Sequence, residues 1–245
     1  MRIALIADLH GNRTATEALE KDLSATRPDQ IWCLGDVCGK GPRSAYTADW
    51  ALANCTLLLR GNWEEHLYRH TFGEKDRYWL DALGPRLDQL GILPNEARAM
   101  LNGRNVRLIH GRELTPRPMR DTLPDEEWAP YFTASDGTRC SVLIYADVHR
   151  PCLRVQSSGY LINCGSVGNA LGQPFGSYAL LEADFTREPS PLDVRFRIFD
   201  YDRSREAEEA AREPDLPCGS GYIREVLTGV YSRGRFTEKE RGNDQ

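Results

Sequence analysis

The sequence predicts an α/β fold whose first half carries a mainly parallel sheet. Three short apolar runs, at residues 2–7, 30–34 and 55–60, each end in polar or glycine-containing turns, as buried strands do. Segments with helical spacing separate these runs. Alternation of strand and helix is typical of α/β domains in which successive strands pair in parallel.

Helices are expected after each of these strands. Residues 12–25 place Ala15 and Leu19 on one helical face, as an amphipathic helix requires. A second helix is expected over residues 44–54, and a third is expected to begin near Trp63. The first half of the chain therefore reads as three strand–helix units.

The second half is expected to be mainly strands. They are predicted at residues 105–109, 141–145, 153–156, 160–163, 177–183 and 192–201. The run Ser157-Ser158-Gly159 between two of them is a hairpin signature.

One long connection interrupts the strands of the second half. Residues 112–137 carry four prolines with acidic residues, which predicts a long surface excursion that could act as a lid. Residues 1–232 are expected to form a single domain, followed by a polar, flexible tail at 233–245.

Composition disfavours several classes of protein. The chain has 245 residues, and 36 acidic against 31 basic side chains give a net charge of −5, which argues against a basic nucleic-acid binder. Mean hydropathy is −0.53, and no run approaches the roughly 20 apolar residues of a membrane-spanning helix. The first apolar run is too short for a signal peptide, and the seven cysteines are scattered, so a cytoplasmic protein with reduced thiols is expected.

Five of the predicted strands end in side chains that can bind a divalent cation. They are Asp8 with His10, Asp36, Asn62, His110, and Asp147 with His149. Ligands of α/β proteins collect at the carboxyl ends of the strands. A cage of oxygen and imidazole ligands suits borderline or hard divalent cations, so a metal site is expected at this edge.

These clusters lie in motifs that resemble those of the calcineurin-like metallophosphoesterase superfamily, specifically its small bacterial and archaeal members. The matching segments are Asp8-Leu9-His10-Gly11-Asn12, Gly35-Asp36-Val37-Cys38-Gly39-Lys40-Gly41-Pro42, Gly61-Asn62-Trp63-Glu64, His110-Gly111, Ala146-Asp147-Val148-His149 and Asn163-Cys164-Gly165-Ser166. The resemblance spans about residues 2–183. It implies a β-sandwich of two mixed sheets flanked by helices.

The resemblance further implies a dinuclear site and a reaction. Asp8, His10 and His149 would hold one ion, Asp36 would bridge both, and Asn62, His110 and Asp147 would hold the second. The ions would be two divalent metals drawn from Mn, Zn, Fe, Ni and Mg. The implied reaction is hydrolysis of a phosphate mono- or diester by a metal-activated hydroxide, with Asp36, Asn62 and His110 as catalytic residues.

Two residues depart from the family pattern. Trp63 replaces a histidine that in the family can protonate the leaving group, and an indole cannot act as an acid near neutral pH. His66, one turn further along the expected helix, could supply the proton instead. Asp147 replaces a histidine, which adds a negative charge and favours harder ions such as Mn²⁺ or Mg²⁺. If Asp147 only orients His149, a single-metal site remains open.

The sequence also predicts residues that contact substrate and the kind of partner that the protein binds. Asn12, Arg60 and Trp63 are candidates for contact with substrate, and Lys40, Arg112 and Arg150 also flank the motifs. A small phosphate ester is the expected partner; no membrane partner is expected, nucleic acid is disfavoured by charge, and the oligomeric state is not indicated. Two alternatives stay open: a catalytically silent metal-binding scaffold with a regulatory role, and a nuclease.

Overall fold

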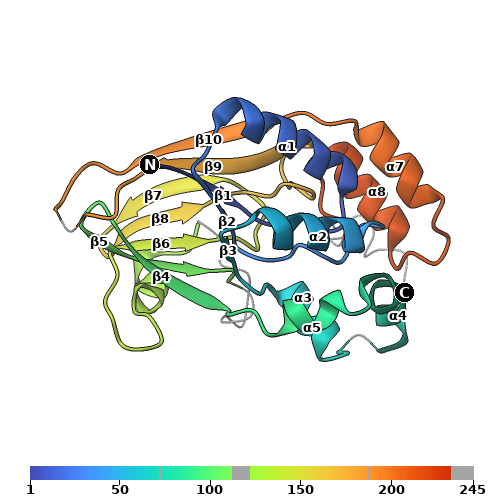
Figure 1. The fold of residues 1–245 in the computed structure, drawn as a ribbon, viewed down its shortest axis with the longest axis horizontal. Helices are drawn as coiled ribbons and strands as arrows, with labels where there is room; N and C mark the ends of the chain where they lie inside the picture. Colours follow the sequence, from blue (N-terminus) through green and yellow to red (C-terminus); the bar gives the residue numbers. More distant parts are fainter. Residues whose placement is uncertain (72, 112–121, 187, 233–245) are drawn as a thin grey trace, which may run out of the picture.

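Two five-stranded mixed sheets form the centre of the structure, a computed structural model that describes residues 1–71, 73–111, 122–186 and 188–232 (Figure 1). The first sheet contains, in spatial order, β10 (Asp193–Phe199), β9 (Gly176–Glu182), β1 (Arg2–Ile6), β2 (Gln30–Cys33) and β3 (Leu57–Leu58). The second contains β4 (Glu96–Leu101), β5 (Arg104–Ile109), β6 (Val142–Tyr145), β8 (Gly159–Asn163) and β7 (Cys152–Gln156).

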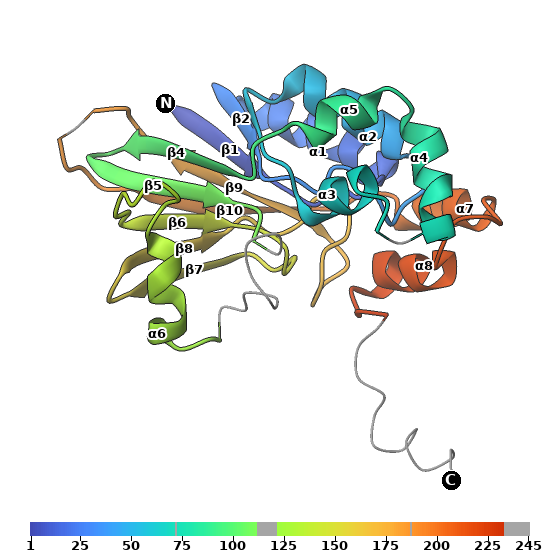
Figure 2. The ribbon, with the colours of Figure 1, turned by 90° about the horizontal axis from the view of Figure 1, so that it is seen from below.

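Helices cover the outer faces of the two sheets (Figure 2). Those between the strands of the first half are α1 (Arg13–Thr26), α2 (Ser44–Asn54), α3 (Asn62–Tyr68), α4 (Arg77–Leu83) and α5 (Arg86–Gly91), with the 3₁₀ turn η1 (Gly73–Asp76) before α4. The short α6 (Asp125–Trp128) and η2 (Ala129–Phe132) lie on the opposite side of the sandwich, and α7 (Arg203–Ala211) and α8 (Gly219–Thr228) close the chain. None of the helices in the described part of the chain has the length and apolarity that a membrane crossing requires.

Strand β1 lies at the middle of this arrangement because it is apolar on both faces. Ile3 and Leu5 pack toward the second sheet, against residues such as Leu108. Ala4 and Ile6 point the other way and join the core beneath α1 and α2. A strand buried on both faces has a continuous apolar sequence, and residues 3–7 show this pattern.

The predicted strand–helix alternation of the first half is confirmed. Strand β2 pairs in parallel with both β1 and β3. Strand β3 is shorter than the predicted 55–60, because the Arg60 N–H leaves the sheet and donates to the carbonyl of Pro94. Strand β9 pairs antiparallel with β1 and makes the sheet mixed. The predicted hairpin is also confirmed, as antiparallel β7 and β8.

The predicted surface excursion at 112–137 is wrong for the segment around α6 and η2. Trp128 and Phe132 are fully buried and pack on the outer face of the second sheet with Tyr145, whose ring centroid lies 4.9 Å from that of Trp128. The prolines misled the prediction: Pro124 precedes the first turn of α6 and Pro130 lies in the first turn of η2, where proline is compatible with a helix. Residues 112–121, and the predicted tail at 233–245, lie outside the described residues.

The sequence did not predict β4 or the helices α4, α5, α7 and α8. Strand β4 pairs antiparallel with β5, although its sequence does not alternate clearly between apolar and polar residues. The two C-terminal helices pack on each other, and α7 contacts α1 (Figure 1). Buried Glu206 joins them: it accepts hydrogen bonds from the Thr14 N–H at 3.2 Å and the Tyr222 hydroxyl at 2.8 Å.

Replacing Trp128 with alanine tests the packed position of this segment. A buried aromatic side chain truncated to alanine leaves a cavity, so Trp128→Ala should lower the free energy of unfolding by about 3–5 kcal/mol. Urea unfolding followed by circular dichroism measures this. The matched control is Ile92→Ala, since Ile92 is 77% exposed. Equal unfolding midpoints for the two variants would contradict burial of residue 128.

Candidate metal centre

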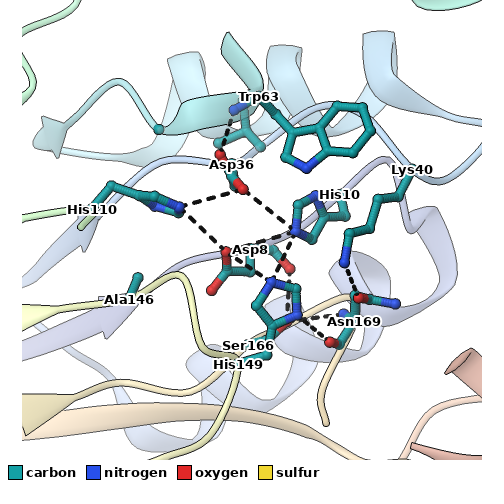
Figure 3. Close-up of polar contacts among 12 residues, drawn as sticks. Asp8, His10, Asp36, Lys40, Trp63, His110, Ala146, His149, Ser166 and Asn169 are labelled. Atoms are coloured by element: carbon teal, nitrogen blue, oxygen red, sulfur yellow. Dashed lines mark hydrogen bonds and ion pairs between the residues drawn. The ribbon is translucent and has the colours of Figure 1, made fainter. Parts of the chain in front are cut away.

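The structure brings five of the predicted ligands together at one edge of the two sheets (Figure 3). They are Asp8, His10, Asp36, His110 and His149, each buried. Asp8 and His10 follow β1, Asp36 follows β2, His110 follows β5, and His149 lies in the turn after β6. Their ligand atoms form two adjoining groups that share Asp8, and within each group all ligand atoms lie within 4.8 Å of one another.

Backbone carbonyls determine which ring nitrogen of each histidine faces the centre. The Nδ1 atoms of His10, His110 and His149 are each hydrogen-bonded to a carbonyl oxygen. The acceptors are Cys38 at 3.2 Å, Leu34 at 2.8 Å, and Asn169, respectively. Because a carbonyl oxygen can only accept, each Nδ1 carries the hydrogen in the neutral ring, and each Nε2 presents a lone pair.

The lone pairs and carboxylates of this centre face one another at short range. The Nε2 atoms of His10 and His149 lie 3.2 Å apart. Oδ1 of Asp8 lies 3.4 Å from Nε2 of His149 and 3.7 Å from that of His10. Within the described residues, neither carboxylate oxygen of Asp8 has a hydrogen-bond partner. Acceptors converging without a donor need a cation between them, so these residues fit a divalent metal.

Asp36 reaches histidines of both groups. Its Oδ2 lies 3.3 Å from Nε2 of His110 and 3.6 Å from Nε2 of His10. Its Oδ1 accepts a hydrogen bond of 2.9 Å from the N–H of Trp63. A carboxylate offers about four lone-pair sites, so Asp36 has capacity left for a cation on its inner oxygen.

Burial is the main influence on the protonation of these groups. It raises the pKa of Asp8 well above its ordinary range, and although His110 opposes this, Asp36 and Asp147 add to it. Burial, followed by the positive charge of Lys40, lowers the pKa of His10 and of His149 well below the ordinary range. Neutral imidazoles with free Nε2 atoms are the form of histidine that binds metals.

The turns that carry these ligands have unusual backbone conformations. The φ angles of Asp8, His10, Asp36, Asp147 and His149 lie between 49° and 67°, in the left-handed region. Non-glycine residues in this region cost free energy and gather at functional sites, and aspartate and histidine are among those that tolerate it. Hydrogen bonds between the turns compensate: the Asp8 N–H donates to the Gly35 carbonyl and the His10 N–H to that of Asp36, both at 3.0 Å.

Glu64 connects two of the ligand-bearing turns. Its fully buried carboxylate accepts hydrogen bonds from backbone N–H groups that belong to both turns. The donors are Asp36 at 2.8 Å, Val37 at 2.9 Å, Cys38 at 3.2 Å and Gly61 at 2.8 Å. Burial, and then the nearby Asp36 carboxylate, raise the pKa of Glu64 above its ordinary value. In the sequence, Glu64 is visible only as a motif position; a glutamate three residues after a helix N-cap is the local signal of this role.

Asn62 and Asp147 occupy different positions relative to the two groups. Oδ1 of Asn62, the first residue of α3, is buried and has no hydrogen-bond partner among the described residues, which leaves an oxygen available as a ligand. Asp147 is half-buried in the turn after β6 and belongs to neither group of the described residues. Its charge nevertheless acts on Asp8.

Two of the residues predicted to contact substrate make hydrogen bonds and ion pairs within the fold. Asn12 is fully buried: its Oδ1 caps α1 by accepting from the Ala15 N–H at 2.8 Å, and its Nδ2 donates to the Gly168 carbonyl at 2.7 Å. Arg60 pairs with Glu65 at 2.9 Å and donates to a backbone carbonyl. These contacts give both residues a role in the fold, and their contact with substrate stays a prediction.

Trp63 forms one wall of the centre. Its ring meets that of His10 edge to face at a centroid distance of 5.9 Å and that of Trp79 at 5.2 Å. The indole lies over the turn after β2, where a Cβ added to Gly39 would come within 2.1 Å of it. Nδ1 of His66, the other histidine considered as a proton donor, lies 3.0 Å from Oγ1 of Thr71.

The segment after β8 supports the turn that carries Asp8. The Ser166 hydroxyl donates to the Asp8 carbonyl at 3.0 Å, and the Asn169 N–H donates to Ser166 Oγ at 2.9 Å. Sequence reasoning missed Asn169, whose backbone oxygen orients His149 and whose Oδ1 accepts from Lys40 at 2.6 Å. Of the other flanking residues, Arg150 is exposed, and Arg112 lies outside the described residues.

Comparisons with known proteins agree with this geometry. A family model for the calcineurin-like phosphoesterase superfamily domain matches residues 1–185. The phosphodiesterase YfcE of Escherichia coli strain K12 is 24% identical over 184 residues, which cover 75% of this chain and 89% of that protein.

Two solved structures share the fold over nearly the whole chain. A metallophosphoesterase from Sphaerobacter thermophilus is 24% identical, with a TM-score of 0.71, and the match covers 94% of this chain and 100% of that one. A hypothetical protein from Pyrococcus horikoshii OT3 is 16% identical, with a TM-score of 0.75 and coverages of 93% and 98%. Both matches extend beyond residue 185, so the arrangement that includes the C-terminal helices recurs in other proteins.

Substituting Glu64 tests whether it holds the two turns together. Glutamine keeps one acceptor oxygen but turns an amide toward the remaining N–H donors, so Glu64→Gln should lower the free energy of unfolding by about 2–6 kcal/mol. Glu208, which pairs with Arg212 on the exposed face of α7, supplies the control, and Glu208→Gln should cost about 1 kcal/mol or less. Chemical denaturation of both variants makes the comparison; similar losses would mean that the Glu64 contacts contribute no more than a surface pair.

Proposed function

The chain belongs to the calcineurin-like phosphoesterase superfamily, and we propose that it hydrolyses phosphate mono- or diesters at a dinuclear metal site. The single observation that carries the proposal is the convergence of three imidazole Nε2 atoms and two buried carboxylates on one centre. No donor within the described residues satisfies the oxygens of Asp8. An electron-rich, water-poor centre of this kind is suited to divalent cations and, through them, to an anionic substrate.

The proposed ligands divide into two sets around the shared carboxylates. Asp8, His10 and His149 would hold one ion, and Asn62 and His110 would hold the other, with the Asp36 carboxylate facing both sets. Asp147 adds negative charge beside the second set. Oxygen and nitrogen ligands of this kind suit Mn, Zn, Fe, Ni or Mg. When bound, two such cations supply Lewis acidity, which lowers the pKa of a water molecule and neutralises phosphoryl oxygens.

The residues of the chain contribute orientation and exclusion of bulk water. The carbonyls of Leu34, Cys38 and Asn169 hold the three rings with Nε2 inward, and Glu64 holds the Asp36 turn. In hydrolysis the oxygen of water forms a bond to phosphorus, the ester P–O bond breaks, and a proton passes to the leaving group. The wall beside the centre is Trp63, whose indole N–H cannot give up that proton at neutral pH.

Removing the charge of Asp36 tests the dinuclear proposal. Asp36→Asn keeps the shape of the side chain but removes the negative charge that faces His10 and His110. We expect metal content to fall at both sets and turnover of bis(p-nitrophenyl) phosphate to fall by at least about 100-fold, the scale of losing a charged group that acts on the transition state. Elemental analysis and a steady-state assay measure the two effects.

The control for this experiment is Asp49→Asn, because Asp49 is an exposed carboxylate paired with Arg86 on the surface. Near-normal activity of Asp36→Asn would sink the dinuclear proposal. A wild-type protein that binds two ions but turns over no activated ester would favour the silent scaffold instead.

Trp63 should make the rate depend on the leaving group. Esters of nitrophenol need no proton on departure, whereas alkyl esters do, and general acid catalysis is worth about 10²–10⁴-fold. We expect Trp63→His to raise kcat on alkyl esters and to leave kcat on nitrophenyl esters nearly unchanged. A uniform rise in KM without the split in kcat would show that the indole acts only by packing.

A further inference from the structure

A lysine ammonium lies beside the metal centre, held by residues from two distant parts of the chain. Lys40 follows Gly39 in the turn after β2, and its Nζ donates to Oδ1 of Asn169 at 2.6 Å. The same Nζ lies 3.6 Å from Oε2 of Glu225 and 6.0 Å from the ring centroid of Tyr231. The side chain is 18% exposed, so it is neither a freely moving surface charge nor a fully buried one.

A single residue, Asn169, connects this ammonium to one of the predicted metal ligands. Asn169 contacts both the lysine and a ligand: its backbone oxygen accepts from Nδ1 of His149, and its Oδ1 accepts from Lys40 (Figure 3). The charge of Lys40 is also felt by His10, whose ring nitrogen faces the centre. An ammonium has three donors, of which Asn169 takes one and Glu225 attracts another. Among the residues that the structure describes, the third donor has no recorded acceptor and can meet a ligand.

Glu225 fixes the direction of the ammonium from the C-terminal helix α8. Its Oε1 accepts from the N–H of Ser232 at 2.9 Å and from the Ser232 hydroxyl at 2.6 Å. Although burial opposes it, the charge of Lys40 and these hydrogen bonds lower the pKa of Glu225, so the residue stays a carboxylate. The lysine is thus anchored by a segment outside the matched family domain, which ends at residue 185.

We propose that Lys40 is a specificity-determining residue that binds a phosphoryl oxygen of the substrate and favours dianionic phosphate monoesters over monoanionic diesters. The proposal rests on the proposed phosphoesterase function. A phosphate monoester carries nearly two negative charges at neutral pH, because its second pKa is about 6. A diester carries one. An added cation at the rim of the site therefore favours the monoester, which carries the additional charge.

Two aryl esters with the same leaving group test this preference. The pair is p-nitrophenyl phosphate and bis(p-nitrophenyl) phosphate, assayed with Mn²⁺-loaded wild type, Lys40→Met and Lys40→Arg. Losing a charged hydrogen bond should lower kcat/KM of Lys40→Met on the monoester by about 10- to 100-fold. The diester should be nearly unaffected, and Lys40→Arg should recover most of the loss. Lys21→Met, which removes an exposed lysine of α1, is the matched control.

The outcome is decisive in either direction. Equal losses on both esters, or no loss on the monoester, would overturn the proposal. Metal content measured on each variant separates a lost substrate contact from a damaged metal centre. If Lys40→Met loses metal as well, the residue is structural and the proposal fails.

Binding of inorganic phosphate separates this proposal from the proposed function. Calorimetry on Mn²⁺-loaded protein should show phosphate affinity falling by about 10-fold or more in Lys40→Met at unchanged metal content. If the wild type hydrolyses neither ester yet shows this difference, the hydrolytic function fails while the anion contact of Lys40 stands. Equal phosphate affinity in wild type and Lys40→Met, or no binding by the wild type, would reject the contact.

Discussion

The structure is organised around a cluster of buried hydrogen-bond acceptors whose lone pairs repel one another. Asp8, Asp36 and three imidazole nitrogens lie within a few ångströms of each other in a place that excludes water. Such a group is unfavourable by itself, because the fold supplies few donors for it. The surrounding structure must therefore hold each acceptor against its tendency to turn away. Backbone carbonyls behind the histidines, the Glu64 carboxylate behind the Asp36 turn and left-handed backbone conformations at four of the five ligands all meet this need.

Site residues could be predicted from the sequence where the signal lies within one short segment. Strand β1 is apolar on both faces and ends in Asp8, so both the strand and the ligand at its end could be predicted from one short segment. The same holds for His110 after β5. The strand ends converge because parallel neighbours end at one edge, which needs no knowledge of side-chain partners.

Prediction failed where a residue's role depends on a distant partner. The hydrogen bond from the Asn12 amide to the Gly168 carbonyl joins two segments far apart in the chain, and no local pattern predicts it. The anchor of Lys40 is equally remote, since Glu225 lies in a helix that the sequence did not reveal. The prolines near Trp128 favour a loop at the sequence level. Tertiary packing nevertheless places Trp128 in a buried cluster on the second sheet. Local sequence patterns indicate secondary structure, but they do not indicate which residues distant in the sequence contact each other.

The contact between Trp63 and Gly39 links two positions that are far apart in the sequence. Since any side chain at position 39 would overlap the indole, a tryptophan at 63 is compatible only with glycine there. The order of substitutions then matters: glycine must be present before the large ring arrives, and a later change at 39 would expel it. A smaller side chain at position 63 would not overlap Gly39, whereas position 39 cannot accept a side chain while the indole remains. The residues at positions 39 and 63 therefore depend on each other. Mutant libraries that vary one of these positions should vary the other as well.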